Sequence, residues 1–268
     1  MGTVFLHTLR ESLLRRIGAV YIGVGFVVFL IYVSSNRFLT QPDGSIVVHS
    51  GRHFIPAETF FRNNLEALLM FAAGLWLFLG LFAAAPLLSS FLEPGWAELL
   101  FSKGIARWKI LLARCAGATV IFLFALLWFP IAPALYVAAR TGISPAPFLV
   151  GLLYVVYSFL AVLALLALVA AAQPNTGLLV IVGFAQLFLS RVLAQRDFQI
   201  YDSITSDWAR WLIEWGYRIL PKTSELHQLG LNYFRFGARV DWWPVWSTAV
   251  FSVAAMALAS WLLHRRNI

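Results

Sequence analysis

The chain has 268 residues, of which 61% are hydrophobic and 12% charged, and its formal net charge is +8. Soluble proteins carry roughly 25% charged residues, so a soluble fold could not bury this much apolar surface and lipid must be the solvent. The basic residues stand mostly at the ends of apolar runs, which indicates membrane topology and not nucleic-acid binding. The single cysteine, Cys115, excludes an internal disulfide and a cysteine-based metal cluster.

Residues 1–16 are expected to form an amphipathic helix at the cytoplasmic face of the membrane. Apolar side chains recur at helical spacing at Leu6, Leu9, Leu13 and Ile17, and charged residues occupy the rest of the wheel. This pattern is typical of an interfacial helix. The apolar run that follows is interpreted as the start of the bundle and not as a cleaved signal peptide, because further apolar runs come after it.

Six apolar runs approach the length of about 20 residues that a helix needs to cross the roughly 30 Å hydrocarbon layer. They continue without period-two alternation, which excludes a closed barrel. We therefore predict one all-α integral membrane domain over residues 1–268. Its spans are 17–33, 67–92, 116–139, 148–172, 176–194 and 245–263.

Lysine and arginine set the predicted orientation. With an even number of spans, both termini share one side with the segment Glu93–Arg114, and the bases there lie close to the spans. Bases on the opposite side are spread over long loops, which count little. Both termini are therefore predicted to be cytoplasmic. The bases on that side are Arg10, Arg15, Arg16, Lys103, Arg107, Lys109, Arg114, Arg265 and Arg266.

Two outer segments separate spans. Residues 34–64 are predicted to be a polar loop with a turn at 42–44. Residues 195–243 are predicted to be helical, with an amphipathic helix that begins after Ser206 and stops at Pro221.

A tryptophan stripe marks that outer helix. Trp208, Trp211 and Trp215 share one face with Leu212 and Ile219. A stripe of this kind at an interface is usually an anchor. A gate or a substrate-facing element is the alternative.

The search for catalytic motifs is negative. The chain has no H-E-x-x-H, no G-x-S-x-G and no phosphate loop. Ionisable residues inside the spans are limited to Glu66 and Arg191 near outer ends, which argues against an ion-coupled carrier. Gln186 is expected to make a helix–helix hydrogen bond. Glu225 and His227 follow Pro221 and could face a substrate path, but two residues apart they point different ways on a helix.

The cytoplasmic segment 93–109 is predicted to form a short charged helix. Pro94 suits the first helical turn, Glu93 and Glu98 lie near its positive end, and Gly104 can end it. Two spans that only had to pack could be joined by a few residues, so the length of this segment suggests that a partner docks there. The alternative is an interfacial helix without a partner.

This segment resembles a known loop. The pattern Gly95-x-x-Glu98-Leu99-Leu100-x-Ser102-Lys103-x-Ile105-x-Arg107 is similar to the cytoplasmic loop of ABC-2 type permeases, in the branch that includes the NosY-like permeases. Those are membrane subunits of ATP-binding-cassette transporters, and their pattern is close to G-T-x-E-x-L-L-S-K-P-I-x-R. The chain departs from it at Trp96, Phe101 and Gly104. The family layout covers nearly the whole chain.

The resemblance implies a permease that does no chemistry itself. Two copies of a separate ABC-type ATPase would bind ATP and Mg, and this chain would have no catalytic, cofactor or metal residues. The coupling residues would be Glu93, Gly95, Glu98, Ser102, Lys103 and Arg107, and the interfacial helix with Arg10, Glu11, Arg15 and Arg16 would touch the same partner.

The same resemblance implies an exporter that works as a dimer of permeases in the lipid bilayer. The compact chain and its short loops suggest a bacterial inner membrane. A homodimer is favoured over a pair of different permeases. The alternatives from other classes are a membrane enzyme, an accessory membrane subunit without an ATPase, and a secondary carrier.

Overall fold

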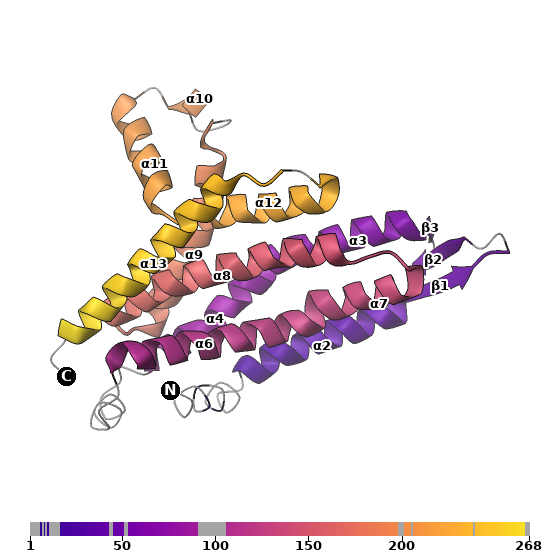
Figure 1. The fold of residues 1–268 in the computed structure, drawn as a ribbon, viewed down its shortest axis with the longest axis horizontal. Helices are drawn as coiled ribbons and strands as arrows, with labels where there is room; N and C mark the ends of the chain where they lie inside the picture. Colours follow the sequence, from indigo (N-terminus) through magenta and orange to yellow (C-terminus); the bar gives the residue numbers. More distant parts are fainter. Residues whose placement is uncertain are drawn as a thin grey trace.

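The computed structural model describes residues 6, 8, 10, 17–42, 45–50, 53–90, 106–197, 201–204, 206–237 and 239–265. Long helices form a bundle with a small sheet at one end (Figure 1). Two π-helical turns, η1 and η3, interrupt two of the helices without ending them. The helical elements are α2 (Ile17–Ser35), α3 (Ala57–Phe71), η1 (Ala72–Trp76), α4 (Leu77–Ser89), α6 (Arg107–Leu126), η3 (Leu127–Ile131), α7 (Ala132–Thr141), α8 (Ala146–Ala172), α9 (Thr176–Ala194), α10 (Tyr201–Ser203), α11 (Asp207–Ile219), α12 (Thr223–Phe236) and α13 (Trp242–Arg265).

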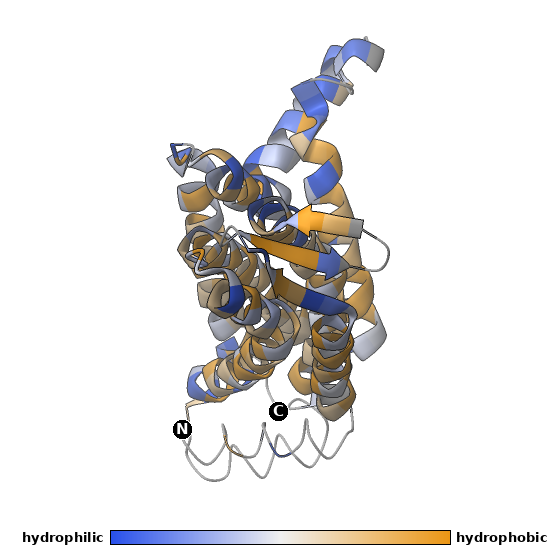
Figure 2. Cartoon of the chain, turned by 90° about the vertical axis from the view of Figure 1, so that its right-hand side faces the viewer, coloured by the Kyte–Doolittle hydropathy of each residue, from blue (hydrophilic) through white to orange (hydrophobic). Residues whose placement is uncertain are grey.

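Five continuous helices in the described part of the chain are long and apolar enough to cross a membrane. They are Ala57–Ser89, Arg107–Thr141, Ala146–Ala172, Thr176–Ala194 and Trp242–Arg265. Hydrophobic residues run along the bundle helices on their outward surfaces as well as inside (Figure 2). The helical, membrane-embedded class is therefore supported. α2 is apolar too, but its part with described side chains, Ala19–Ser35, is shorter, so the sixth span stays a prediction.

Two helices extend well beyond the predicted spans. The helix that overlaps the predicted span 67–92 runs from Ala57 to Ser89, and the one that contains 116–139 begins at Arg107. Hydropathy detects the lipid-facing part of a helix, whereas backbone hydrogen bonding continues into water wherever neighbouring elements support it. The added turns of α3 carry the exposed residues Glu58 and Arg62.

A three-stranded antiparallel sheet occupies the region that was predicted to be a polar loop. β1 (Asn36–Thr40) pairs with β2 (Ile46–Ser50), and β2 pairs with β3 (His53–Pro56). The predicted polar loop over residues 34–64 therefore contains strands and the start of α3, while the fold as a whole is predominantly helical. The strands are short, but they bury β-branched and aromatic side chains against the helix ends.

The sheet gains its core from the bundle. Val48 is fully buried, and Phe38 packs edge-on against Phe60 of α3 and Tyr136 of α7, with ring centroids 6.0 and 5.6 Å away. A hairpin of this size would be marginal alone, so its register depends on these contacts. The sheet therefore marks the end of the bundle where α3 begins and α7 ends (Figure 1).

The opposite end of the bundle gathers several helix termini. The Arg107 guanidinium at the start of α6 donates to the Leu263 carbonyl near the end of α13, at 2.6 Å. The hydroxyls of Ser89, at the end of α4, and Thr176, at the start of α9, are 2.5 Å apart. The described residues that flank segment 91–105 thus lie at the end where α13 finishes (Figure 1).

The core is built from aromatic pairs and close helix crossings around α8. Phe122 of α6 and Phe159 of α8 stack at 4.0 Å. Gly80 of α4 lies against both, and a Cβ there would sit 2.8 Å from Phe122. Small residues of this kind let helices approach closely in a membrane.

The outer segment 195–243 contains more structure than the sequence indicated. α11 runs from Asp207 to Ile219, between Ser206 and Pro221 as predicted, although the Ser206 side chain makes no capping hydrogen bond. α12 falls in the segment predicted to be helical, although its bounds were not predicted; it packs lengthwise on α8 and also meets α9 and α3. Gly230 interrupts its apolar face, so the helical spacing of apolar residues is harder to recognise in the sequence.

Candidate functional site: a charged junction of α9, α11 and α12

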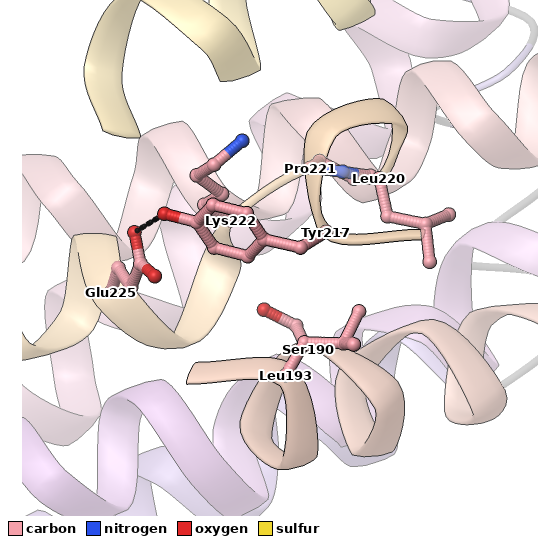
Figure 3. Close-up of a pocket in the computed structure, with 7 residues that line it drawn as sticks. All are labelled: Ser190, Leu193, Tyr217, Leu220, Pro221, Lys222 and Glu225. Atoms are coloured by element: carbon pink, nitrogen blue, oxygen red, sulfur yellow. Dashed lines mark hydrogen bonds between the residues drawn. The ribbon is translucent and has the colours of Figure 1, made fainter. Parts of the chain in front are cut away.

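A small cavity lies where the end of α9 meets the connection between α11 and α12. α9 contributes Ser190 and Leu193, and the other lining residues are Tyr217, Leu220, Pro221, Lys222 and Glu225. The Tyr217 ring lies over Ser190 and Leu193, and its hydroxyl points to Glu225 (Figure 3). Three titratable side chains therefore meet at one turn of the chain.

Arg196, just past the end of α9, links the three helices. Its guanidinium stacks 3.4 Å from the Tyr217 ring centroid. Its nitrogens lie 3.5 Å from Glu214 of α11 and 3.7 Å from Glu225 of α12. A third carboxylate, Asp197, is 3.5 Å away. The Arg196 side chain is only 14% exposed, so these contacts act in a partly desolvated setting where they are stronger than at the surface.

Lys222 is the most buried cation of the junction, with 3% of the residue exposed. Its ammonium lies 4.5 Å from the Tyr217 ring and 5.5 Å from the Trp243 ring at the start of α13. It has no hydrogen-bond partner among the described residues. The aromatic faces therefore provide its electrostatic support as cation–π contacts.

Hydrogen bonds between side chains and the backbone hold the connection between α11 and α12 in place. The Gln186 side chain donates to the Pro221 carbonyl at 2.8 Å, and the Lys222 N–H donates to the Thr248 hydroxyl at 3.1 Å. The Ser224 N–H donates to the Ser190 hydroxyl at 2.9 Å. Gln186 was expected to bond to another helix. It bonds instead to the connection between α11 and α12, where the Pro221 carbonyl also accepts the Thr223 N–H at 3.0 Å.

Burial shifts the ionisation of the junction. Desolvation raises the pKa of Glu225, and it raises the pKa of Tyr217 to about 12 with a further contribution from Glu225. Desolvation also lowers the pKa of Lys222. Burial together with the charge of Arg191 lowers the pKa of His227 to about 4. At neutral pH His227 is therefore neutral.

Glu214 behaves differently from Glu225. Burial acts to raise its pKa, but hydrogen bonds from Arg218 and Tyr201 and the charge of Arg196 lower it. Glu214 therefore stays ionised and holds Arg196 and Arg218 on one side of α11.

The contacts of the junction join helix ends through hydrogen bonds, ion pairs and ring contacts. The Ser190 hydroxyl accepts the Ser224 N–H, and no hydrogen bond from it to a general base is among the described contacts. Within the described ranges, no three histidine, cysteine or acidic side chains are placed to hold a metal ion. The arrangement can fix α11 and α12 to α9.

Within the described part of the chain, the predicted coupling, interfacial and tryptophan residues do not line this cavity. Arg107 binds the Leu263 carbonyl, Arg10 is exposed, and the tryptophans of α11 are exposed. The remaining predicted coupling and interfacial residues lie outside the described part of the chain: Glu93, Gly95, Glu98, Ser102, Lys103, Glu11, Arg15 and Arg16.

Sequence reasoning noticed Glu225 but missed Arg196 and Lys222. One signal was available, since both cations lie next to helix ends in a segment rich in aromatic residues. The ion pair between Arg196 and Glu225 could not be predicted from the sequence, because these residues come together only when α9 and α12 pack in the folded protein.

The fold and the junction together define a helical protein whose long apolar helices suit a membrane-embedded chain. No protein-family model matches the chain, and no curated protein sequence matches it.

Proposed function

We propose that the chain is the membrane permease subunit of an ABC-2 type ABC transporter, acting as an exporter. A separate ATPase would hydrolyse ATP, and the chain would transmit that motion to a path along the interface of a permease dimer. The proposal rests on the loop pattern from Gly95 to Arg107 and on where that loop is attached.

The attachment of segment 91–105 is the observation that carries the proposal. Its described neighbours, Ser90 and Ala106, lie at the end of the bundle where α13 finishes, and Arg107 ties the start of α6 to Leu263. A partner that pushes on this loop would therefore move α4, α6 and α13 together. A coupling element needs such a rigid connection to more than one helix.

The mechanism is a difference in stability between inward and outward states. ATP binding would close two nucleotide-binding subunits and shift two permeases against each other. The junction at Arg196 supports this scheme, because it makes α11 and α12 follow α9 as one body. A twofold homodimer is the simplest assembly.

The test is purification of the tagged chain from its native host in a mild detergent, with mass spectrometry of what co-purifies. We expect a soluble protein with a phosphate loop, at about one copy per permease, retained in a nucleotide-dependent way. A chain recovered without any nucleotide-binding partner under several conditions would reject the proposal in favour of a carrier or an accessory subunit.

A further inference from the structure

α11 presents an apolar face that no described residue of the chain covers. Trp208, Trp211 and Trp215 are 69, 58 and 46% exposed, and Leu212 and Ile219 on the same face are 51 and 58% exposed. Tyr217 on the opposite side is the buried residue of this helix and attaches it to the junction. An exposed apolar face of this size usually contacts lipid or another protein.

A second group of tryptophans continues this face at the start of α13. Trp242, Trp243 and Trp246 are 60, 57 and 65% exposed. They occupy the first turns of a helix that is long and apolar enough to cross a membrane. Tryptophan gathers at that position, because its ring is apolar and its N–H still needs a polar partner.

The junction brings the end of α11 that carries Tyr217 close to the start of α13, because Lys222 contacts the rings of both Tyr217 and Trp243. Arg196 ties α11 to the end of α9, and Lys222 lies over Trp243 at the start of α13. α11 leads away sideways from the bundle, instead of running along it (Figure 1). The exposed tryptophans therefore lie on helices that meet at the end of α9 and the start of α13, two helices of membrane length.

Polar structure continues beyond the end of α9 and the start of α13. α12 runs on along α8 until Arg235 pairs with Glu66 of α3. The first turns of α3 carry exposed Glu58 and Arg62, and the sheet follows. These parts suit water, so the boundary of the hydrocarbon falls at the tryptophans and not at the far end of the bundle.

From this arrangement we infer that α11 and the first turns of α13 form one lipid-binding surface. It lies at the boundary between headgroups and acyl chains in the leaflet on the side of the sheet. A second protein copy is the other possible occupant, but helix seams in membranes favour small residues, whereas this face carries tryptophan, leucine and isoleucine. The surface holds the charged junction at a fixed depth. The inference does not depend on the proposed transport function.

The test measures depth with nitroxide labels in vesicles of phosphatidylcholine and phosphatidylglycerol. Cys115 is the sole cysteine and is buried, so Cys115→Ala gives a clean background. Single-cysteine variants are Trp211→Cys and Trp246→Cys. Val253→Cys on α13 and Phe54→Cys on β3, 70 and 66% exposed, serve as references for the hydrocarbon and for water.

We expect the ratio of collisions with oxygen to collisions with a water-soluble nickel chelate to fall from Val253 to the two tryptophan positions, and again to Phe54. Arg210→Cys, on the opposite face of α11, should give a ratio closer to Phe54 than Trp211 does. A label at Trp211 that meets nickel as readily as the one at Phe54 would overturn the inference. So would a label that neither collider reaches, since a protein would then cover the face.

A second position guards against a variant that fails to fold. Trp208→Cys lies on the same stripe and should report the same depth as Trp211→Cys. Each variant is accepted when it elutes from a sizing column as the background protein does.

Discussion

Arg196 shows how one side chain can join three helices. It follows α9, stacks on Tyr217 of α11 and faces Glu225 of α12. Its nitrogen–oxygen distances, 3.5 to 3.7 Å, are longer than those of ideal ion pairs, and the stacked ring adds a cation–π contact to them.

Arg196→Ala should destabilise the protein, because it leaves Glu225 buried without its cation and removes the stacked contact. We expect a loss of roughly 2 kcal/mol, which corresponds to a fall in Tm of about 4–8 °C for a chain of this size. Thermal unfolding in detergent measures it.

The matched control for that variant is Arg218→Ala. Arg218 also pairs with Glu214, at 3.1 Å, but its side chain is 61% exposed. Its removal should cost less than about 0.5 kcal/mol. Equal effects of the two variants would mean that Arg196 is no more than a surface ion pair.

His227 should make stability fall in acid. Its folded pKa of about 4 lies below the ordinary value of 6.5, so the unfolded chain binds a proton first as the pH drops. The contribution is complete above pH 6.5 and is lost as the pH falls toward about 4, by up to roughly 3 kcal/mol. Thermal unfolding between pH 7.5 and 4.5 measures the slope.

His227→Leu isolates this contribution. The raised pKa of Glu225 acts with the opposite sign, since the folded state then keeps its proton to a higher pH than the unfolded state does. The variant retains the Glu225 effect and should therefore be less sensitive to acid than the parent. An unchanged slope would show that His227 is not the group that titrates.

At the scale of elements, α12 is fixed to α8 through two glycines. A Cβ on Gly230 would lie 3.0 Å from the Gly151 carbonyl oxygen and 3.3 Å from the Gly151 Cα. The obstacle is backbone, which cannot rotate away, so the two helices would have to separate.

Gly230→Ala should therefore destabilise the protein by about 1–3 kcal/mol, although alanine is the better helix former. Gly216→Ala on α11 is the control, because nothing lies within 4 Å of the added Cβ. It should be neutral or stabilise by up to about 1 kcal/mol. Melting temperatures in detergent compare the two, and a stabilised Gly230 variant would contradict the close crossing.

The segment between α4 and α6 should carry the contact with the proposed ATPase. Glu98→Arg and Lys103→Glu reverse charges in the loop pattern and are expected to lower the amount of ATPase that co-purifies, and to uncouple hydrolysis from transport. The protein should still insert. Glu58→Arg, an equivalent reversal on exposed α3 at the other end of the bundle, serves as the control. Normal retention and transport in both loop variants would remove the docking role.

At the scale of the whole molecule, the sheet and the end of α13 should face opposite sides of the membrane. In the Cys115→Ala background, Phe54→Cys is 66% exposed and should react with a membrane-impermeant maleimide added outside intact spheroplasts. A protease-sensitive tag after residue 268 should be cut only in broken membranes. The reverse pattern would invert the predicted orientation.

Much of the helical framework could be predicted from hydropathy, and the parts that could not were decided by packing. The predicted span 176–194 coincides with α9, whereas the helix that overlaps the predicted span 67–92 starts at Ala57, because its polar turns are supported by the sheet. The bounds of α12 were not predicted, because its glycine and polar residues do not form a clear helical pattern in the sequence. Their role is evident only where α12 packs against α8. Pro221, by contrast, ended α11 where expected, because a proline acts on its own backbone.

The sequence by itself determined that the chain belongs in lipid, where α11 begins and ends, and which loop resembles a docking segment. These features depend on composition and on residues close in sequence. The tertiary structure alone decided the charged junction, the strands within residues 36–56 and the approach of α11 to the start of α13. The contacts that create them join residues far apart in the chain, and their free energy exists only once the helices have packed.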